Sequence, residues 1–454
     1  MRFPRYDKYK DSGVKWLGEI PDHWVMPPLW TLFKRNKRTN FQDEQLLSVY
    51  RDFGVIPKAD RNDNFNKASE DLSAYQLVDF GDLTINKMKA WQGSVAVSEY
   101  RGIVSPAYFV YEAMHRENSR YLHYLMRSPR YVTGYLSLSQ GIRVNQWDLQ
   151  PNYHRRMPVV LPTLLEQTQI ARFLDHETSK IDALIREQER LIELLQEKRQ
   201  AVISHAVTKG LDPDVPMKNS GVEWLGEVPE GWDVAKLKHV LSEAMTYGAN
   251  ESAESDNRDF PRYIRITDLT ENGGLREDTF KSLPWEKSKG YLLSDGDILL
   301  ARSGATVGKS FLYRDLYGKA CYAGYLIKAR CEKQKVLPDY IYAFLQSHSY
   351  WEYIGVINIK ATIQNVSAEK YGNLYMPIPS LKEQREILPW LEQEVSRTET
   401  LVEEAKKTIK LMKERRSALI SAAVTGKIDV RGWKPPADES AFAESGTEDM
   451  EATV

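Results

Sequence analysis

Apolar residues recur at seven-residue intervals along two long stretches of the chain, Glu166–Gly210 and Glu383–Lys427. Aligned without a gap at a constant shift of 217, the two stretches are identical at 18 of 45 positions, which indicates an internal repeat. Neither stretch has a glycine before its closing turn, and Pro389 stands in the first turns, where a helix tolerates proline. The pattern predicts two long helices of one kind.

Apolar side chains seven residues apart are typical of the seam of a coiled coil. We expect the two helices to bury their seams against each other as an antiparallel pair. The alternative is that each helix packs only on the domain beside it. The predicted seam residues are Leu174, Ile181, Gln188 and Leu195 in the first helix and Leu391, Val395, Val402, Ala405, Ile409 and Met412 in the second.

The repeat extends to a short segment that precedes each globular part of the chain. Asp11–Trp24 returns as Asn219–Trp232, with nine of fourteen positions identical. We expect the two tryptophans of each copy to pack on a core. Because Asn219–Trp232 follows the first helix directly, Asp11–Trp24 should lie beside the end of the second helix, near Thr425–Val430.

Two globular segments, residues 25–162 and 233–379, resemble each other less but share landmarks. Each has a Gly-Asp turn and a strand that ends on a basic residue (80–87; 295–302), then an amphipathic helix (121–128; 340–347) and a polar loop (139–148; 358–367). The predicted fold class is α+β, with two α/β domains joined by two antiparallel helices in a tandem repeat with pseudo-two-fold symmetry. The predicted ranges are 1–162 for the first domain with its lead-in, 163–215 for the central helix, 216–379 for the second domain, 380–430 for the distal helix and 431–454 for a disordered acidic tail.

Charge and composition change this interpretation little. The formal net charge is −1, but the tail from residue 431 has six acidic and two basic residues, which leaves +3 on residues 1–430. A weak overall charge is therefore compatible with a basic binding surface. Cys321 and Cys331 have neither CxxC spacing nor neighbouring histidines, and no apolar run reaches ~18 residues. We expect reduced structural thiols, no metal, no membrane span and a cytoplasmic location.

The turn after the Gly-Asp strand is the first candidate for DNA contact in each domain. RSGATVGKS (302–310) has only three residues between its glycines and lacks the first glycine of a P-loop, so nucleotide binding is disfavoured. Instead, Arg302, Ser303, Thr306 and Lys309 have side chains suited to guanine and phosphate. The corresponding turn of the first domain, KMKAWQGS (87–94), offers Lys87, Lys89 and Gln92.

Two further candidate surfaces are polar. Polar side chains stand in the loop before each long helix; they are Arg143, Asn145 and Gln146 with Gln140 in the first domain, and Lys360, Thr362, Gln364 and Asn365 in the second. The amide and guanidinium groups among them are of the types that read base edges in the major groove. The other interpretation is a solvated loop. A basic cluster, Lys34–Arg38, includes Lys34 and Arg35 as candidates for the DNA backbone, although such a cluster is as often a solvated face.

Motifs of catalysis are absent from the sequence. There is no N-P-P-[YF] motif for methyl transfer, no G-x-G-x-x-G cofactor loop, no HExxH, and no nuclease-like set of paired acids with a lysine. We therefore expect a chain that is non-catalytic by itself.

Together these features closely resemble the specificity (S) subunits of type I restriction–modification systems. The resemblance covers about residues 11–430 and rests on the paired SGVxWLGExPxxW segments, the RSGATVGK turn, and the helices that begin with EQ and end with AVISHAVTKG and ALISAAVTGK. The first domain has KMKAWQGSV in place of the RSGATVGK signature, which leaves its DNA-reading residues less defined.

The resemblance implies two target-recognition domains, each reading half of an asymmetric, interrupted double-stranded DNA site, with the helices as spacer. It also implies two modification subunits that carry S-adenosylmethionine, and restriction subunits that use ATP and Mg; no cofactor would be held by this chain. Two alternatives stay open, a free-standing two-headed DNA-binding regulator and a scaffold that links proteins without binding DNA.

Overall fold

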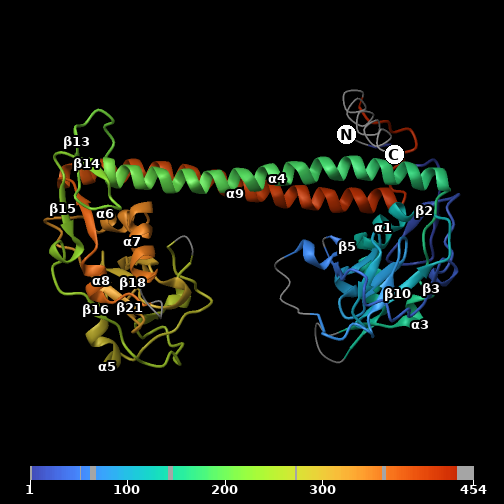
Figure 1. The fold of residues 1–454 in the computed structure, drawn as a ribbon, viewed down its shortest axis with the longest axis horizontal. Coiled ribbons are helices and arrows are strands. Elements are labelled where there is room, and N and C mark those ends of the chain that lie inside the picture. Colours follow the sequence, from blue (N-terminus) through green and yellow to red (C-terminus); the bar gives the residue numbers. More distant parts are fainter. Residues whose placement is uncertain are drawn as a thin grey trace. The chain divides into compact units, whose positions relative to one another are not determined.

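The computed structural model describes residues 3–51, 53–61, 68–141, 147–270, 273–359 and 365–436. The chain forms two compact units: unit 1 comprises residues 1–188 and 407–454, and unit 2 comprises residues 189–406. The boundary between the units passes through both long helices, whereas the predicted ranges give each helix a range of its own. Each unit therefore contains one globular domain and the adjoining parts of both helices (Figure 1).

The two predicted long helices are confirmed as α4, Leu164–Lys209, and α9, Leu381–Val424. Each begins with a reciprocal capping pair. In α4 the hydroxyl of Thr163 accepts from the backbone N–H of Glu166 and the Glu166 carboxylate accepts from that of Thr163, both at 3.3 Å. Ser380 and Glu383 do the same for α9, at 3.3 and 3.0 Å. These pairs satisfy backbone donors that a helix start leaves free, which explains why EQ opens both helices.

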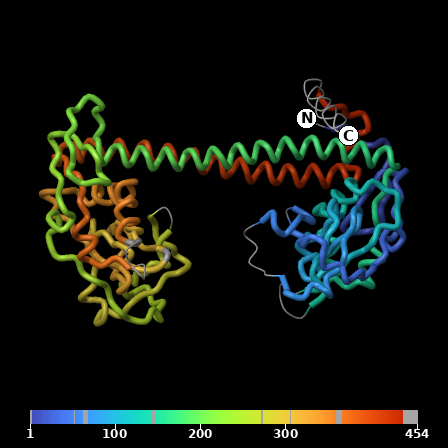
Figure 2. The backbone as a smooth tube through the Cα atoms, in the orientation of Figure 1, coloured from blue at the N-terminus to red at the C-terminus, as the bar shows by residue number. Residues whose placement is uncertain are grey.

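Within each unit, α4 and α9 run side by side (Figure 2). In unit 1, Asp182 pairs with Arg416 at 2.9 Å, and Gln169, earlier in α4, donates to the carbonyl of Val430, beyond the end of α9. In unit 2, Arg199 lies 3.5 Å from Glu399, and the core contains residues from the last turns of α4 and the first turns of α9. The pairing is therefore antiparallel in both units.

The predicted seam faces inward. Leu174, Ile181, Leu195, Leu391 and Ala405 are buried, and Gln188, Val395, Val402, Ile409 and Met412 are half-buried. Part of this burial comes from the domains, because Leu174 belongs to the core of unit 1 and Leu391 to that of unit 2.

Unit 1 is built on a four-stranded antiparallel sheet of order β3-β10-β7-β8. Its strands are β1 (Tyr9–Asp11), β2 (Glu19–Pro21), β3 (Phe33–Arg35), β4 (Leu47–Tyr50), β5 (Gly54–Pro57), β6 (Gln76–Val78), β7 (Leu83–Asn86), β8 (Val95–Val97), β9 (Gly102–Val104), β10 (Tyr108–Ala113), β11 (Ser139–Gln140) and β12 (Asp148–Leu149). Its shorter helices are α1 (Ser119–Arg127), α2 (Pro129–Leu138) and α3 (Pro151–His154). Buried side chains of β7, β8, α1 and α2 form one core with the starting turns of α4.

Unit 2 repeats this plan with the order β16-β21-β18-β19. Its strands are β13 (Met217–Asn219), β14 (Glu227–Pro229), β15 (Asp233–Lys236), β16 (Thr246–Tyr247), β17 (Arg262–Ile264), β18 (Ile298–Ala301), β19 (Ser310–Leu312), β20 (Ala320–Tyr322), β21 (Leu326–Ala329) and β22 (Tyr375–Ile378). Its shorter helices are α5 (Trp285–Ser288), α6 (Pro338–Phe344), α7 (His348–Ile359) and α8 (Ala368–Gly372). The domains differ beside this sheet, where β6 and β9 pair antiparallel but β17 and β20 pair parallel.

The shared landmarks keep their places in the two sheets. β7 and β18 follow the two Gly-Asp turns and are followed by Lys87 and Arg302. The predicted amphipathic helices are α1 and α6. The sequence interpretation did not include α2 and α7, which follow them almost at once: α2 starts at Pro129, directly after Ser128, and α7 starts at His348.

The two lead-in segments are β-hairpins of identical register, β1–β2 and β13–β14. Their second tryptophans are buried, with Trp24 0% and Trp232 2% exposed. Trp16 packs edge-on against Tyr131, and Trp224 packs against Tyr353 with the two rings tilted by 46°. The packing role predicted for these tryptophans is confirmed.

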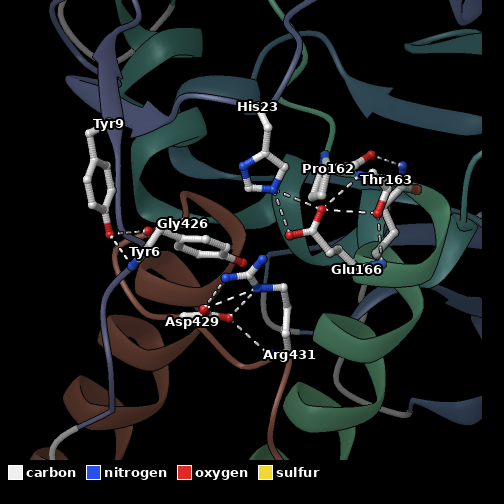
Figure 3. A network of polar contacts seen from close by, with 10 residues as sticks. Tyr6, Tyr9, His23, Pro162, Thr163, Glu166, Gly426, Asp429 and Arg431 are labelled. Carbon is white, nitrogen blue, oxygen red and sulfur yellow. Dashed lines mark hydrogen bonds and ion pairs between the residues drawn. The ribbon is translucent and has the colours of Figure 1, made fainter.

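The first hairpin lies where predicted, beside the end of α9 (Figure 3). The Tyr9 hydroxyl donates to the carbonyl of Gly426 at 2.9 Å, and the backbone N–H of Asp429 donates to the carbonyl of Pro4 at 2.8 Å. His23 reaches Glu166 in the capping pair of α4 at 2.9 Å. The N-terminal segment therefore joins the beginning of one long helix to the end of the other within unit 1.

The ordered chain continues past Val430. Trp433 packs edge-on against Phe173, and its carbonyl accepts from Gln169 at 2.6 Å. Most of the predicted acidic tail, residues 437–454, lies outside the described residues. Cys321 and Cys331 are free and buried, and burial raises the pKa of each thiol to about 12. Among the described helices, none is long and apolar enough to cross a membrane.

Candidate nucleic-acid interface

The sheet of the second domain brings the ends of two strands to one edge. In unit 2, β16 and β18 both run antiparallel to β21, so they point the same way and both end at the same edge. Tyr247 closes β16, and Arg302 follows β18. In unit 1, β3 and β7 also run the same way beside β10, but Arg35 lies level with Leu83 at the start of β7, whereas Lys87 follows the end of that strand. The ends of β7 and β18 therefore carry a candidate basic residue in each domain.

The Arg302–Lys309 turn is anchored from below by two buried tyrosines. Gly308 donates its N–H to the hydroxyl of Tyr371 at 3.1 Å, and its carbonyl accepts from the hydroxyl of Tyr350 at 2.6 Å. Gly308 has φ +88°, and a Cβ there would stand 2.8 Å from the ring of Trp351. Only glycine fits such a backbone next to a packed ring. The glycines are thus required for the backbone conformation of this turn.

The turn presents its polar side chains at the surface. Lys309 is exposed, and Arg302, Ser303 and Thr306 are half-buried. Gly304, at φ +74°, has open space around its missing Cβ. A phosphate or base edge can therefore approach the backbone there closely, as a glycine turn permits.

The second candidate loop of this domain meets the first. Ser303 and Asn365 form an antiparallel bridge, and the N–H of Val366 donates to the carbonyl of Arg302 at 2.8 Å. Asn365 is exposed. The other predicted residues of the loop, Lys360, Thr362 and Gln364, lie outside the described residues.

In the first domain the two candidate loops also contact each other, after the corresponding strand β7. The N–H of Leu149 donates to the carbonyl of Lys87 at 3.0 Å, and the rings of Trp91 and Trp147 meet edge-on at 4.9 Å. Lys89 and Gln92 are exposed and Lys87 is half-buried. Arg143, Asn145 and Gln146 lie outside the described residues, whereas Trp147, at one end of their loop, packs against Trp91 of the turn.

The basic cluster 34–38 divides into two roles. Lys34 and Arg35 are exposed on β3, and the Arg35 guanidinium lies 4.2 Å from the centre of the Phe109 ring. Arg38 instead turns inward and pairs with the buried Asp82 of the Gly-Asp turn. Burial raises the pKa of Asp82, so the adjacent guanidinium compensates a carboxylate that is costly to bury. Arg38 is therefore a structural residue.

The second Gly-Asp turn has the same device. Asp297 is fully buried, and Nε and one terminal nitrogen of Arg330 each donate a hydrogen bond of 2.7 Å to its carboxylate. The carboxylate also accepts from the backbone N–H of Ser294 at 2.8 Å. In both domains a buried ion pair thus fixes the start of the strand that delivers the candidate basic residue. The sequence showed the Gly-Asp turns but not their arginine partners, Arg38 and Arg330, which lie after β3 and β21.

Reasoning from the sequence missed Tyr247 and Trp147. Tyr247 lies beneath Arg302, with 4.8 Å between the guanidinium carbon and the ring centre. Its position, 55 residues before Arg302, gives no local signal that the two meet. Trp147 stood in the polar loop, and its pairing with Trp91 follows only from the tertiary fold. Among the described residues there is no group of three or more His, Cys, Asp or Glu side chains placed to hold a metal.

Comparison with known proteins gives a consistent result. Residues 229–411 match the family described as "Type I restriction modification DNA specificity domain". The chain is 23% identical, over 95% of its length and 99% of the relative's, to the putative type I restriction enzyme MjaX specificity subunit of Methanocaldococcus jannaschii. It is 22% identical to the EcoKI specificity subunit of Escherichia coli K12, with 92% and 91% of the two chains covered.

A solved structure supports the fold. A chain from a study titled as the structural basis of complex assembly and conformational transition of the type I R-M system superimposes with a TM-score of 0.67, covering 90% of this chain and 99% of the other at 16% identity. The likeness extends to the architecture of two globular domains joined by two long helices. The sequence is thus similar to type I restriction enzyme specificity subunits over nearly the whole chain, and residues 229–411 match the specificity-domain family.

Proposed function

We propose that each domain reads one half of an asymmetric, interrupted site in double-stranded DNA, with the sheet edge described above as the reading surface. The observation that carries this proposal is the meeting of two candidate loops at the same edge in both domains, at Ser303–Asn365 in one and Trp91–Trp147 in the other. The framework is repeated while the side chains on it differ. A repeated framework with different side chains suits two half-sites of different sequence.

The side chains at these edges divide into two kinds of DNA contact. Lys89 and Lys309 are exposed, flexible cations suited to phosphates, which position a protein without reading sequence. Arg302, Asn365 and Gln92 carry the planar guanidinium and amide groups that can form paired hydrogen bonds with base edges. We assign sequence reading to the second group.

The test is selection of bound duplexes from a library with a long randomised segment, by the full chain together with its modification subunits. The expected result is a motif of two short defined parts separated by an unread gap. A single continuous motif that is bound equally well without modification subunits would favour a free-standing regulator. Binding without sequence preference would contradict the proposed reading of sequence, and no salt-dependent binding would favour a protein scaffold.

We also propose that two modification subunits dock on the long helices, one on each unit. Exposed leucines recur at the constant shift of 217, so that Leu184 corresponds to Leu401 and Leu194 to Leu411. Unit 1 thus exposes Leu184 (51%) and Leu411 (55%), and unit 2 exposes Leu401 (43%) and Leu194 (46%). Two equivalent pairs of exposed leucines on the long helices suit two copies of one partner.

Charged substitutions test this docking. Leu184→Asp with Leu411→Asp should reduce the bound modification subunits from two to one, as measured by native mass spectrometry of the co-expressed complex. The double variant Leu401→Asp with Leu194→Asp should have the same effect. Retention of two subunits by either variant would contradict the assignment. In this scheme S-adenosylmethionine belongs to the modification subunits, and ATP and Mg to restriction subunits.

A further inference from the structure

Arg302 differs from the other arginines of the second domain. Each of the others within residues 233–379 has a carboxylate at ion-pair distance; they are Arg258, Arg262, Arg265, Arg276, Arg314 and Arg330. Within the described part of this domain, Arg302 meets no carboxylate. An arginine without an anionic partner, at an edge that carries polar loops, is available to an acceptor from outside the chain.

Two neighbours nevertheless fix the orientation of this side chain. The guanidinium carbon lies 4.8 Å from the centre of the Tyr247 ring, and Nε donates a long hydrogen bond, 3.5 Å, to Oδ1 of Asn365. The Tyr247 hydroxyl in turn accepts from the N–H of Ala368 at 3.1 Å, which holds the ring itself. Among the described residues the terminal nitrogens of Arg302 have no protein acceptor.

This arrangement suits a base better than a phosphate. Stacking on an aromatic ring restrains the plane of a guanidinium, and a restrained plane favours the two parallel hydrogen bonds that arginine makes to O6 and N7 of guanine. A contact to phosphate alone needs only a cation within reach, and exposed Lys309 in the same turn provides one.

We propose that Tyr247 is a positioning residue that presents Arg302 to a guanine in the major groove of the half-site read by the second domain. This inference rests on the proposed function and adds to it one residue and one base. In the first domain the residue after the corresponding strand is Lys87, and its ammonium group lacks the planar pair of donors that a guanidinium has. The guanine contact thus belongs to one half-site only.

The test compares Tyr247→Leu, Tyr247→Phe and Arg302→Lys in the full chain, in complex with its modification subunits. Selected duplexes from the randomised library are sequenced, and affinities for the best duplex and its single-base changes are measured at several salt concentrations. Tyr153→Leu, at an exposed tyrosine of the other domain, is the matched control. Thermal melting shows that each variant is folded.

Tyr247→Leu and Arg302→Lys should each reduce discrimination for guanine at one position by about tenfold or more, with the salt dependence unchanged. Tyr247→Phe keeps the ring and should retain most of the preference. Equal loss of affinity for every sequence would identify a phosphate contact and overturn the inference, as would unchanged discrimination in Tyr247→Leu. If the unsubstituted complex selects no sequence, the proposed function itself fails.

Discussion

Gly426, just beyond the end of α9, lies directly against Pro21 of the N-terminal hairpin. A Cβ at Gly426 would stand 2.3 Å from Cδ of Pro21 and 3.1 Å from the Trp24 ring, and the residue has φ +71°. Gly210, beyond the end of α4, has φ +79° and faces Trp232 of the second hairpin in the same way. In both units, therefore, a glycine just beyond the end of a long helix packs against the second tryptophan of a hairpin.

Gly426→Ala should lower the free energy of unfolding by about 1–3 kcal/mol, because a left-handed backbone disfavours a Cβ and this Cβ also overlaps the hairpin. Urea unfolding of the full chain measures the effect. Gly432→Ala is the matched control, since a Cβ there meets nothing within 4 Å. Equal stabilities of the two variants would contradict the contact.

Glu166 gives the junction a dependence on pH. Burial raises the pKa of its carboxyl, but hydrogen bonds from His23 and Thr163 outweigh burial and lower the pKa below its ordinary value of 4.5. A carboxyl with a lowered pKa stabilises the fold fully above the ordinary value, and this contribution is lost as pH falls through the lowered one.

Glu166→Gln removes this linkage. The stability advantage of the unsubstituted chain over the variant should be constant near neutral pH and should shrink progressively below about pH 4.5. Thermal melting from neutral to acidic pH measures it. A difference that stays constant across the range would show that the hydrogen bonds do not depend on the charge of Glu166.

The first long helix offers a matched pair of leucines. Leu174 is fully buried in the core of unit 1, while Leu184 on the same helix is 51% exposed. Leu174→Ala should cost about 2–5 kcal/mol through lost burial and a cavity, whereas Leu184→Ala should change stability by less than about 0.5 kcal/mol. Denaturant unfolding of both variants is the check, and similar losses would refute the packing described here.

The sequence alone was sufficient for the parts of the fold that depend on periodicity and repetition. The seven-residue rows predicted both helices and their inward faces, and the order of the repeat predicted that Asp11–Trp24 lies beside the end of α9. Local patterns could not reveal α2 and α7, because they follow α1 and α6 almost without a break in composition. The parallel pairing of β17 with β20 was equally hidden, since it joins strands more than fifty residues apart.

The candidate interface was predicted in pieces and assembled by the fold. Arg302 and Asn365 were both proposed from residue type, but the bridge between their loops depends on the sheet order. Arg38 shows the limit of residue type as a guide, because it belongs to a basic cluster and yet pairs with buried Asp82. The contact of the remaining candidates with DNA stays a prediction.

Division of labour between the two domains is the central claim, and site selection with paired variants tests it most directly. Arg302→Ala with Lys309→Ala, and separately Gln92→Ala with Lys89→Ala, are compared with the unsubstituted complex on the randomised library. Each double variant should lose on the order of 1–3 kcal/mol of discrimination per affected base pair in one half-site and leave the other half unchanged. Equal loss in both half-sites from either variant would contradict the account.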